Sequence, residues 1–175
     1  MSQMKPLQFL KIIALSLSLS VAALAQRPAG DVVQFSLTAL NGPPVTSESL
    51  HGEVVVLAFG ASWLPLSKNQ LQSLKKLADD YADRGVVVYW VSTESESPRS
   101  KNYASNEQLR ALAQRNSVSV LRDPDGEVSH RLGIDQIPAI VILNKQGELV
   151  GDPIKGSDSG GNLAAQVRDQ LQRAL

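Results

Sequence analysis

The sequence predicts a single α/β domain in which a partly parallel central sheet is flanked by helices. Two continuous apolar runs, at residues 53–60 and 86–91, are typical of central strands covered on both faces. Between them, Leu71, Leu74 and Leu77 recur at helical spacing. Strands that alternate with helices in this way favour an α/β sandwich.

The first half of the chain carries recognisable strand and turn signals. Residues 33–38 alternate apolar and polar side chains, as a half-buried strand does, and Asn41-Gly42 then predicts a hairpin. Residues 46–50 predict one capped turn before the strand at 53–60. A helix follows from about Leu66 to Arg84, which Gly85 ends. After the second apolar run, residues 92–105 are polar and aperiodic, so we expect a surface loop there.

The second half repeats the alternation in shorter elements. Residues 106–114 predict a helix with Asn106 as its cap, and residues 118–121 a strand. A turn at residues 123–126 leads to a short helix at 127–132. Residues 139–143 form the next strand, and a turn at 144–147 returns residues 148–150 as a hairpin. A Gly- and Asp-rich loop then precedes a closing amphipathic helix at residues 162–175.

The chain divides into residues 1–25, with the pattern of a secretory signal peptide, and one domain at 26–175. Lys5 and Lys11 precede an apolar stretch that ends in Ala-Leu-Ala at residues 23–25, a small-x-small cleavage pattern. The stretch is shorter than the roughly 20 residues that span a bilayer, and serines interrupt it. We therefore expect cleavage near Ala25 and a periplasmic or secreted product that meets the membrane only through this segment. The alternative is an uncleaved anchor.

Charge and composition give no sign of nucleic acid or metal as a partner. The 17 basic residues equal the 17 acidic ones, and two basic residues lie in the predicted signal segment, so the remainder carries a net charge near −2. Such a balance does not attract a polyanion. The two histidines, His51 and His130, form no ligand-spaced pair. We expect no metal site and no cofactor.

The most specific motif is a strand, then Trp63, then x-Pro-x-x, then a helix. This order resembles the thioredoxin-like redoxin superfamily, nearest the exported TlpA-like thiol–disulfide oxidoreductases, with the AhpC/TSA peroxiredoxins as relatives. Segments at 35–42, 54–63, 123–126, 133–134, 137–139 and 144–147 are similar in order, and the resemblance spans about residues 32–173. It implies a thioredoxin-like fold with an N-terminal β-hairpin extension, and a cis bond before Pro138.

The chain departs from that resemblance at the reactive positions. Leu64 and Ser67 stand where the superfamily has its two cysteines, and the chain contains no cysteine. The thiolate is the nucleophile of disulfide exchange and is stabilised at a helix N-terminus. Thiol exchange, thiol peroxidase and thiol-dependent copper chemistry therefore lack their reactive atom. We predict no catalytic residue, and Leu64 and Ser67 are the degenerate redox positions.

The resemblance implies a groove that holds extended polypeptide beside the cis proline. The predicted binding residues are Trp63, Leu64, Pro65, Leu66, Ser67, Ile137 and Pro138. We therefore predict a non-catalytic module that binds a protein or peptide of the cell envelope.

Several alternatives stay open. The leucines fill a decayed site, Trp63 is a core or lid residue, or the chain is a structural subunit of an envelope complex. The family also implies oxidoreductase or antioxidant activity. A Ser67–His130–Asp135 hydrolase requires a geometry that the sequence does not show. The loop at 92–105 is either a partner-binding insertion or surface disorder.

Overall fold

The computed structural model describes residues 32–156 and 163–175, so the predicted signal segment lies outside the described residues. One sheet has the strand order β2-β1-β5-β4-β3-β6-β7. The strands are β1 (Ser36–Ala39), β2 (Val45–Thr46), β3 (Val54–Gly60), β4 (Val86–Ser92), β5 (Ser119–Arg122), β6 (Ala139–Leu143) and β7 (Ile154–Lys155). The helices are α1 (Pro65–Tyr81), α2 (Asn106–Asn116), α3 (Glu127–Arg131) and α4 (Leu163–Ala174), with 3₁₀ turns at Glu48–Leu50 and Ala82–Arg84.

The sheet is mixed, as predicted. Strands β3, β4 and β5 run parallel, whereas β6 pairs antiparallel with β3 and β1 pairs antiparallel with β5. The predicted N-terminal hairpin forms between β1 and β2. Among the described residues, no helix is both long and apolar enough to cross a bilayer.

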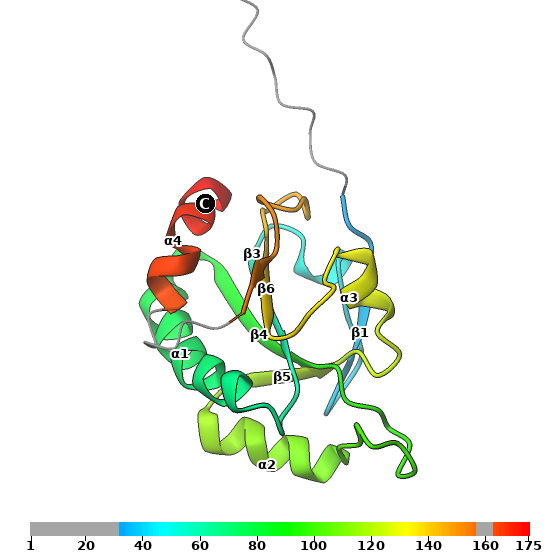
Figure 1. The fold of residues 1–175 in the computed structure, drawn as a ribbon. Helices are drawn as coiled ribbons and strands as arrows, with labels where there is room; N and C mark the ends of the chain where they lie inside the picture. Colours follow the sequence, from blue (N-terminus) through cyan, green and yellow to red (C-terminus); the bar gives the residue numbers. More distant parts are fainter. Residues whose placement is uncertain (1–31, 157–162) are drawn as a thin grey trace, which may run out of the picture.

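Strand β3 is buried along its whole length because its alternating side chains feed two cores. Val54, Val56 and Ala58 face the core that α1, α2 and α4 cover. Val55, Leu57 and Phe59 face the core that α3 and the N-terminal segment close. Figure 1 shows α1 and α4 on one side of the sheet and α3 on the other.

Helix boundaries differ from the prediction where capping chemistry decides them. Helix α1 begins at Pro65, because proline suits the first helical position, and it ends in a 3₁₀ turn before Gly85, whose φ is 69°. The cap of α2 is Ser105, not Asn106. The Ser105 hydroxyl accepts from the Gln108 backbone N–H, and the Gln108 side chain accepts from the Ser105 N–H, which completes a capping box.

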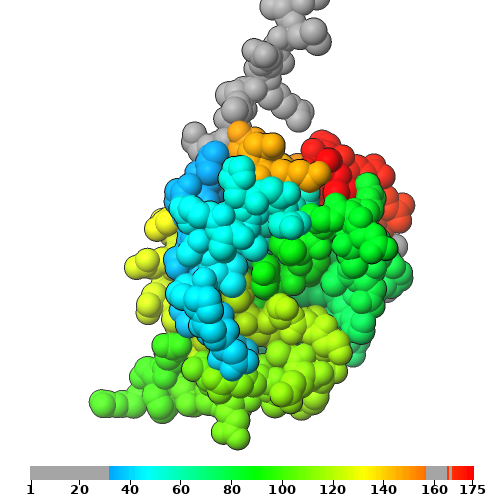
Figure 2. Space-filling model, turned by 180° about the vertical axis from the view of Figure 1, so that it is seen from behind, coloured from blue at the N-terminus to red at the C-terminus, as the bar shows by residue number. Residues whose placement is uncertain are grey.

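The predicted return hairpin after β6 forms only in part. Leu149 makes a single bridge to Leu143, and the strand that pairs along the start of β6 is β7, inside the segment predicted as a loop. Figure 2 shows the N-terminal residues (blue to cyan) covering one side of the molecule, with the loop after β4 (green) projecting from its lower end.

Candidate functional site

The predicted site residues gather at the carboxyl end of β3. Phe59 pairs with Ala139, so Gly60 and Pro138 follow at the same end of the sheet. The Ile137–Pro138 peptide bond is cis, as the resemblance implied. The buried Gln70 side chain of α1 ties this end together: its amide nitrogen donates to the Ala139 carbonyl over 3.4 Å, and its oxygen accepts from Trp90 Nε1. The 61–67 segment and the 137–138 segment therefore share one end of one rigid unit.

Leu64 occupies the N-cap of α1 without the chemistry of a cap. Its backbone is extended, with φ −75° and ψ 125°, and no side chain caps the helix. Pro65 has no N–H, so Leu66 and Ser67 carry the first free N–H groups of the helix. Leu64 is half-buried, whereas Pro65 and Leu66 are exposed, Leu66 to 42%.

Ser67 is fully buried and serves the backbone. Its hydroxyl accepts from the Ala61 N–H over 3.3 Å. The space around it depends on Gly60, because a Cβ there would lie 2.7 Å from Ser67 Oγ and 3.0 Å from Trp90 Nε1. Ser67, at the position that the resemblance assigns to the second cysteine, is thus a packed structural hydroxyl beside a glycine that leaves it room.

Trp63 is the largest exposed apolar side chain of this region, at 58%. Its indole N–H donates to Asn102 Oδ1 over 2.7 Å, and the Asn102 amide donates in turn to the Thr93 carbonyl. The ring is therefore displayed to solvent yet fixed through its polar edge to the loop after β4.

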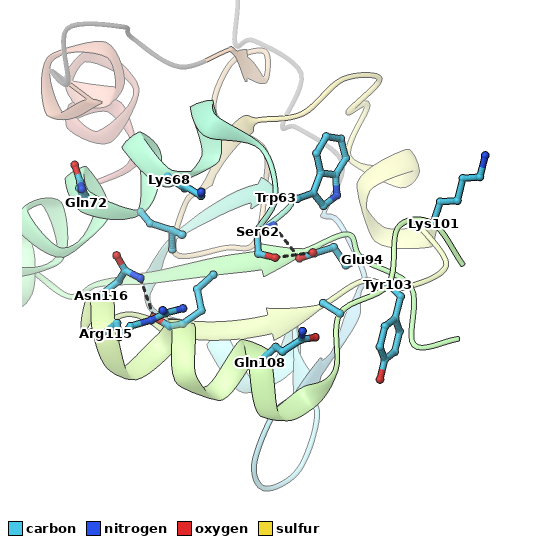
Figure 3. A pocket seen from close by; sticks show the side chains of 13 residues that line it. Ser62, Trp63, Lys68, Gln72, Glu94, Lys101, Tyr103, Gln108, Arg115 and Asn116 are labelled. Atoms are coloured by element: carbon cyan, nitrogen blue, oxygen red, sulfur yellow. Dashed lines mark hydrogen bonds between the residues drawn. The ribbon is translucent and has the colours of Figure 1, made fainter. Parts of the chain in front are cut away.

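Glu94 connects that same loop to the residue before Trp63. The Glu94 carboxylate is 1% exposed and accepts from the Ser62 N–H at 2.9 Å, the Ser62 hydroxyl at 2.7 Å and the Ser92 hydroxyl at 3.0 Å. Figure 3 shows the Ser62 and Glu94 side chains meeting between α1 and α2. A buried carboxylate that accepts three hydrogen bonds is well compensated.

Arg122, at the end of β5, anchors the loop between β4 and α2. Its guanidinium is 2% exposed and donates to the carbonyls of Glu94, Ser95 and Ala104. The loop is therefore an anchored support for Trp63, which corrects the expectation of surface disorder. The sequence did not predict a role for Glu94, Asn102 or Arg122. The only signals were a carboxylate directly after an apolar run and an arginine at the end of a buried strand.

The side chains of the Ser67–His130–Asp135 hydrolase alternative lie in different environments. His130 lies exposed on α3, whereas Ser67 is enclosed beside Ala61. The Lys155 ammonium bonds the Asp135 carboxylate at 2.8 Å, and this hydrogen bond lowers the pKa of Asp135. In the described ranges, no three His, Asp or Glu side chains cluster as a metal site would require.

An open pocket of about 700 Å³ lies between α1 and α2, next to the predicted groove. Trp63 and Tyr103 line one end, Leu71 and Leu112 supply apolar contact, and Lys68 and Arg115 come from the two helices. Of the predicted binding residues only Trp63 lines it, so the pocket extends beyond the groove that the resemblance implied.

Comparison with known proteins points to one family. Residues 28–151 match the AhpC/TSA family. The chain is 27% identical to the soluble secreted antigen MPT53 of Mycobacterium tuberculosis over 119 residues, which cover 68% of this chain and 64% of that protein. It is 23% identical to the thiol-disulfide oxidoreductase ResA of Halalkalibacterium halodurans over 124 residues, covering 71% of this chain and 66% of ResA.

Solved structures agree at the level of the fold. A thiol:disulfide interchange protein DsbE of Chlorobium tepidum superposes with a TM-score of 0.66 at 21% identity, covering 83% of this chain and 96% of that one. The segment that matches the AhpC/TSA family, residues 28–151, includes Trp63, Leu64, Ser67 and Pro138. The chain therefore belongs to the AhpC/TSA family, as a member without cysteine.

Proposed function

We propose that this chain is an exported, non-catalytic binding protein that holds extended polypeptide on the surface of Trp63, Leu64, Pro65 and Leu66 beside Ile137–Pro138. The observation that carries the proposal is the presentation of Trp63. Its ring is 58% exposed, and its indole N–H is fixed to Asn102. An exposed, positioned aromatic loses little conformational freedom on binding and is typical of binding hot spots.

The neighbouring side chains support the same conclusion. Pro65 and Leu66, two and three positions after Trp63, add exposed apolar surface at the start of a helix packed on the core. Adjacent exposed apolar residues mark interaction sites more often than scattered ones do. Ser67, in contrast, is enclosed and hydrogen-bonded, so it supports the surface without joining it.

Export rests on the sequence pattern of residues 1–25 and on one relative. MPT53 is named as a secreted antigen. The signal-like segment and that relative together favour function outside the cytoplasm.

The test measures affinity for a reduced, carboxymethylated and hence unfolded polypeptide by calorimetry. We expect Leu66→Asp and Trp63→Ala each to weaken binding by about tenfold or more, equivalent to about 1.4 kcal/mol or more. Val32→Asp is the matched control, because Val32 is 50% exposed and bridges Glu148 at the opposite end of the sheet.

Absence of binding by the unsubstituted chain would overturn the proposal. Equal losses in Leu66→Asp and Val32→Asp would do so too, because they would show unspecific apolar adhesion. An insulin-reduction assay on the same sample separates holding from thiol exchange, for which we expect no turnover.

A further inference from the structure

The pocket between α1 and α2 continues the proposed binding surface past Trp63. Trp63 belongs to both, and the pocket runs from it between the two helices. Figure 3 shows Lys68 on the α1 side and Arg115 on the α2 side, with Tyr103 near the Trp63 end. A polypeptide that crosses Trp63 therefore has an adjoining concave site of about 700 Å³ to enter.

The cations of this pocket differ from those elsewhere on α1. Lys75 and Lys76 each form an ion pair four residues on, with Asp79 and Asp80, at 2.6 Å. In the ranges 32–156 and 163–175, Lys68, Lys101 and Arg115 form no salt bridge. Three cations line one pocket, and none of them has a carboxylate partner in the part of the chain that the structure describes.

Glu94, the carboxylate that lines this pocket, forms no ion pair with these cations in the described ranges. Glu94 is 1% exposed, and both of its oxygens accept hydrogen bonds from Ser62, with Ser92 adding a third donor. Its carboxylate oxygens are therefore engaged by Ser62 and Ser92, next to Trp63. The pocket therefore combines exposed cationic groups with an apolar lining from Leu71 and Leu112.

The positive charge of the pocket favours a ligand that carries carboxylates. Carboxylates pair with lysine and arginine, and a concave site limits the water that screens them. The 17 basic and 17 acidic residues of the whole chain give no broad positive field, so a long polyanion such as nucleic acid gains little beyond the pocket itself. A short acidic segment fits the local charge better than a polyanion does.

We propose that the pocket receives an acidic segment of the bound polypeptide, with Lys68 and Arg115 pairing its carboxylates while apolar residues beside it rest on Trp63 and Leu66. This inference rests on the proposed function, since it specifies which polypeptides the same surface prefers. It predicts recognition of apolar sequences flanked by Asp or Glu.

The experiment compares two peptides by calorimetry on the purified full chain. Both share a central Leu-Val-Ala-Leu, flanked on each side by Asp-Glu-Asp in one and by Asn-Gln-Asn in the other. We expect the acidic peptide to bind about tenfold more tightly, as two partly screened ion pairs allow, and added salt to remove the difference.

Two double variants of equal charge change locate the effect. Lys68→Gln/Arg115→Gln removes the pocket cations, whereas Lys75→Gln/Lys76→Gln removes two exposed cations that already have partners on α1. We expect only the first pair to erase the preference for the acidic peptide. Circular dichroism verifies that both variants fold.

The outcomes separate the two proposals. If the peptides bind with equal affinity, or if the two double variants lose the preference equally, the acidic-segment inference is overturned while polypeptide binding stands. If neither peptide binds, the proposed function itself fails. The comparison of peptides on the unsubstituted chain decides the inference even where a variant does not fold.

Discussion

Leu64 stands at a helix N-cap that its side chain cannot serve. Pro65, the first residue of the helix, has no N–H. The N–H groups of Leu66 and Ser67, which follow it, receive no hydrogen bond from a capping side chain. Serine, threonine, aspartate or asparagine at such a position stabilises a helix, and an anion there also suits the helix dipole. A leucine at this place forgoes that stabilisation in exchange for apolar surface.

We expect Leu64→Asp to be more stable than Leu64→Ala by about 1 kcal/mol, because the carboxylate caps α1 and alanine does not. Alanine is the proper reference, since both changes remove the half-buried leucine side chain. Urea denaturation at neutral pH measures the difference. The polypeptide affinity of Leu64→Asp should fall at the same time.

Equal stability of the two variants would show that the first N–H groups of α1 have other partners. A more stable variant that binds more weakly would show that Leu64 is retained for contact rather than for folding.

At the scale of elements, the loop between β4 and α2 is a support for Trp63. Few backbone hydrogen bonds lie within it: Ser95 N–H donates to the Asn102 carbonyl, Ala104 N–H to the Ser95 carbonyl, and Ser100 N–H to the Ser97 carbonyl. The Arg122 guanidinium donates hydrogen bonds to three carbonyls of the loop. Within the loop, Asn102 accepts from the Trp63 indole and Glu94 accepts from Ser62, so the anchored loop fixes both residues. A long polar loop thus becomes a fixed part of the site through one buried guanidinium.

We expect Arg122→Lys to destabilise the chain by about 3 kcal/mol, because a single ammonium cannot reach the carbonyls that the guanidinium fork satisfies. Amide exchange in the loop should quicken, and the indole N–H resonance of Trp63 should shift while that of the buried Trp90 stays. Arg110→Lys is the control, since Arg110 binds Asn41 and the Leu40 carbonyl at the surface.

A loss from Arg122→Lys no larger than that from Arg110→Lys would contradict this role. An unshifted Trp63 resonance in a destabilised protein would show that Asn102 positions the indole without help from Arg122.

At the scale of the whole molecule, the features that repeat along the sequence were predicted and the features that depend on single polar contacts were not. Strands β3 and β4 followed from continuous apolar runs, because burial on both faces leaves no polar alternation. Ser105 was missed as a cap because Asn106 also has capping chemistry, and only the position of Gln108 decides between them. Strand β7 was missed because two residues carry no periodicity.

For the candidate site, too, some features were predicted from the sequence and others were not. The placement of Trp63, Leu64 and Ser67 at the start of a helix followed from the motif, and the cis bond before Pro138 was implied by the resemblance to the superfamily. The support by Glu94, Asn102 and Arg122 depends on contacts across 32, 39 and 28 positions of sequence, which no local pattern encodes. The pocket depends on the distance between two helices, which is a property of the packed fold.

The intact thioredoxin-like fold predicts that cysteines placed at positions 64 and 67 would give the chain thiol–disulfide exchange activity. Leu64 lies half-exposed at a helix N-terminus, where a thiolate is stabilised, and Ser67 lies enclosed one turn on, beside Gly60, which has no Cβ to contact it. We expect Leu64→Cys/Ser67→Cys to catalyse insulin reduction by dithiothreitol at a rate at least about tenfold above either single variant, because exchange needs an attacking and a resolving thiol. A folded double variant without turnover would contradict the inference that only the reactive atoms are missing from this site.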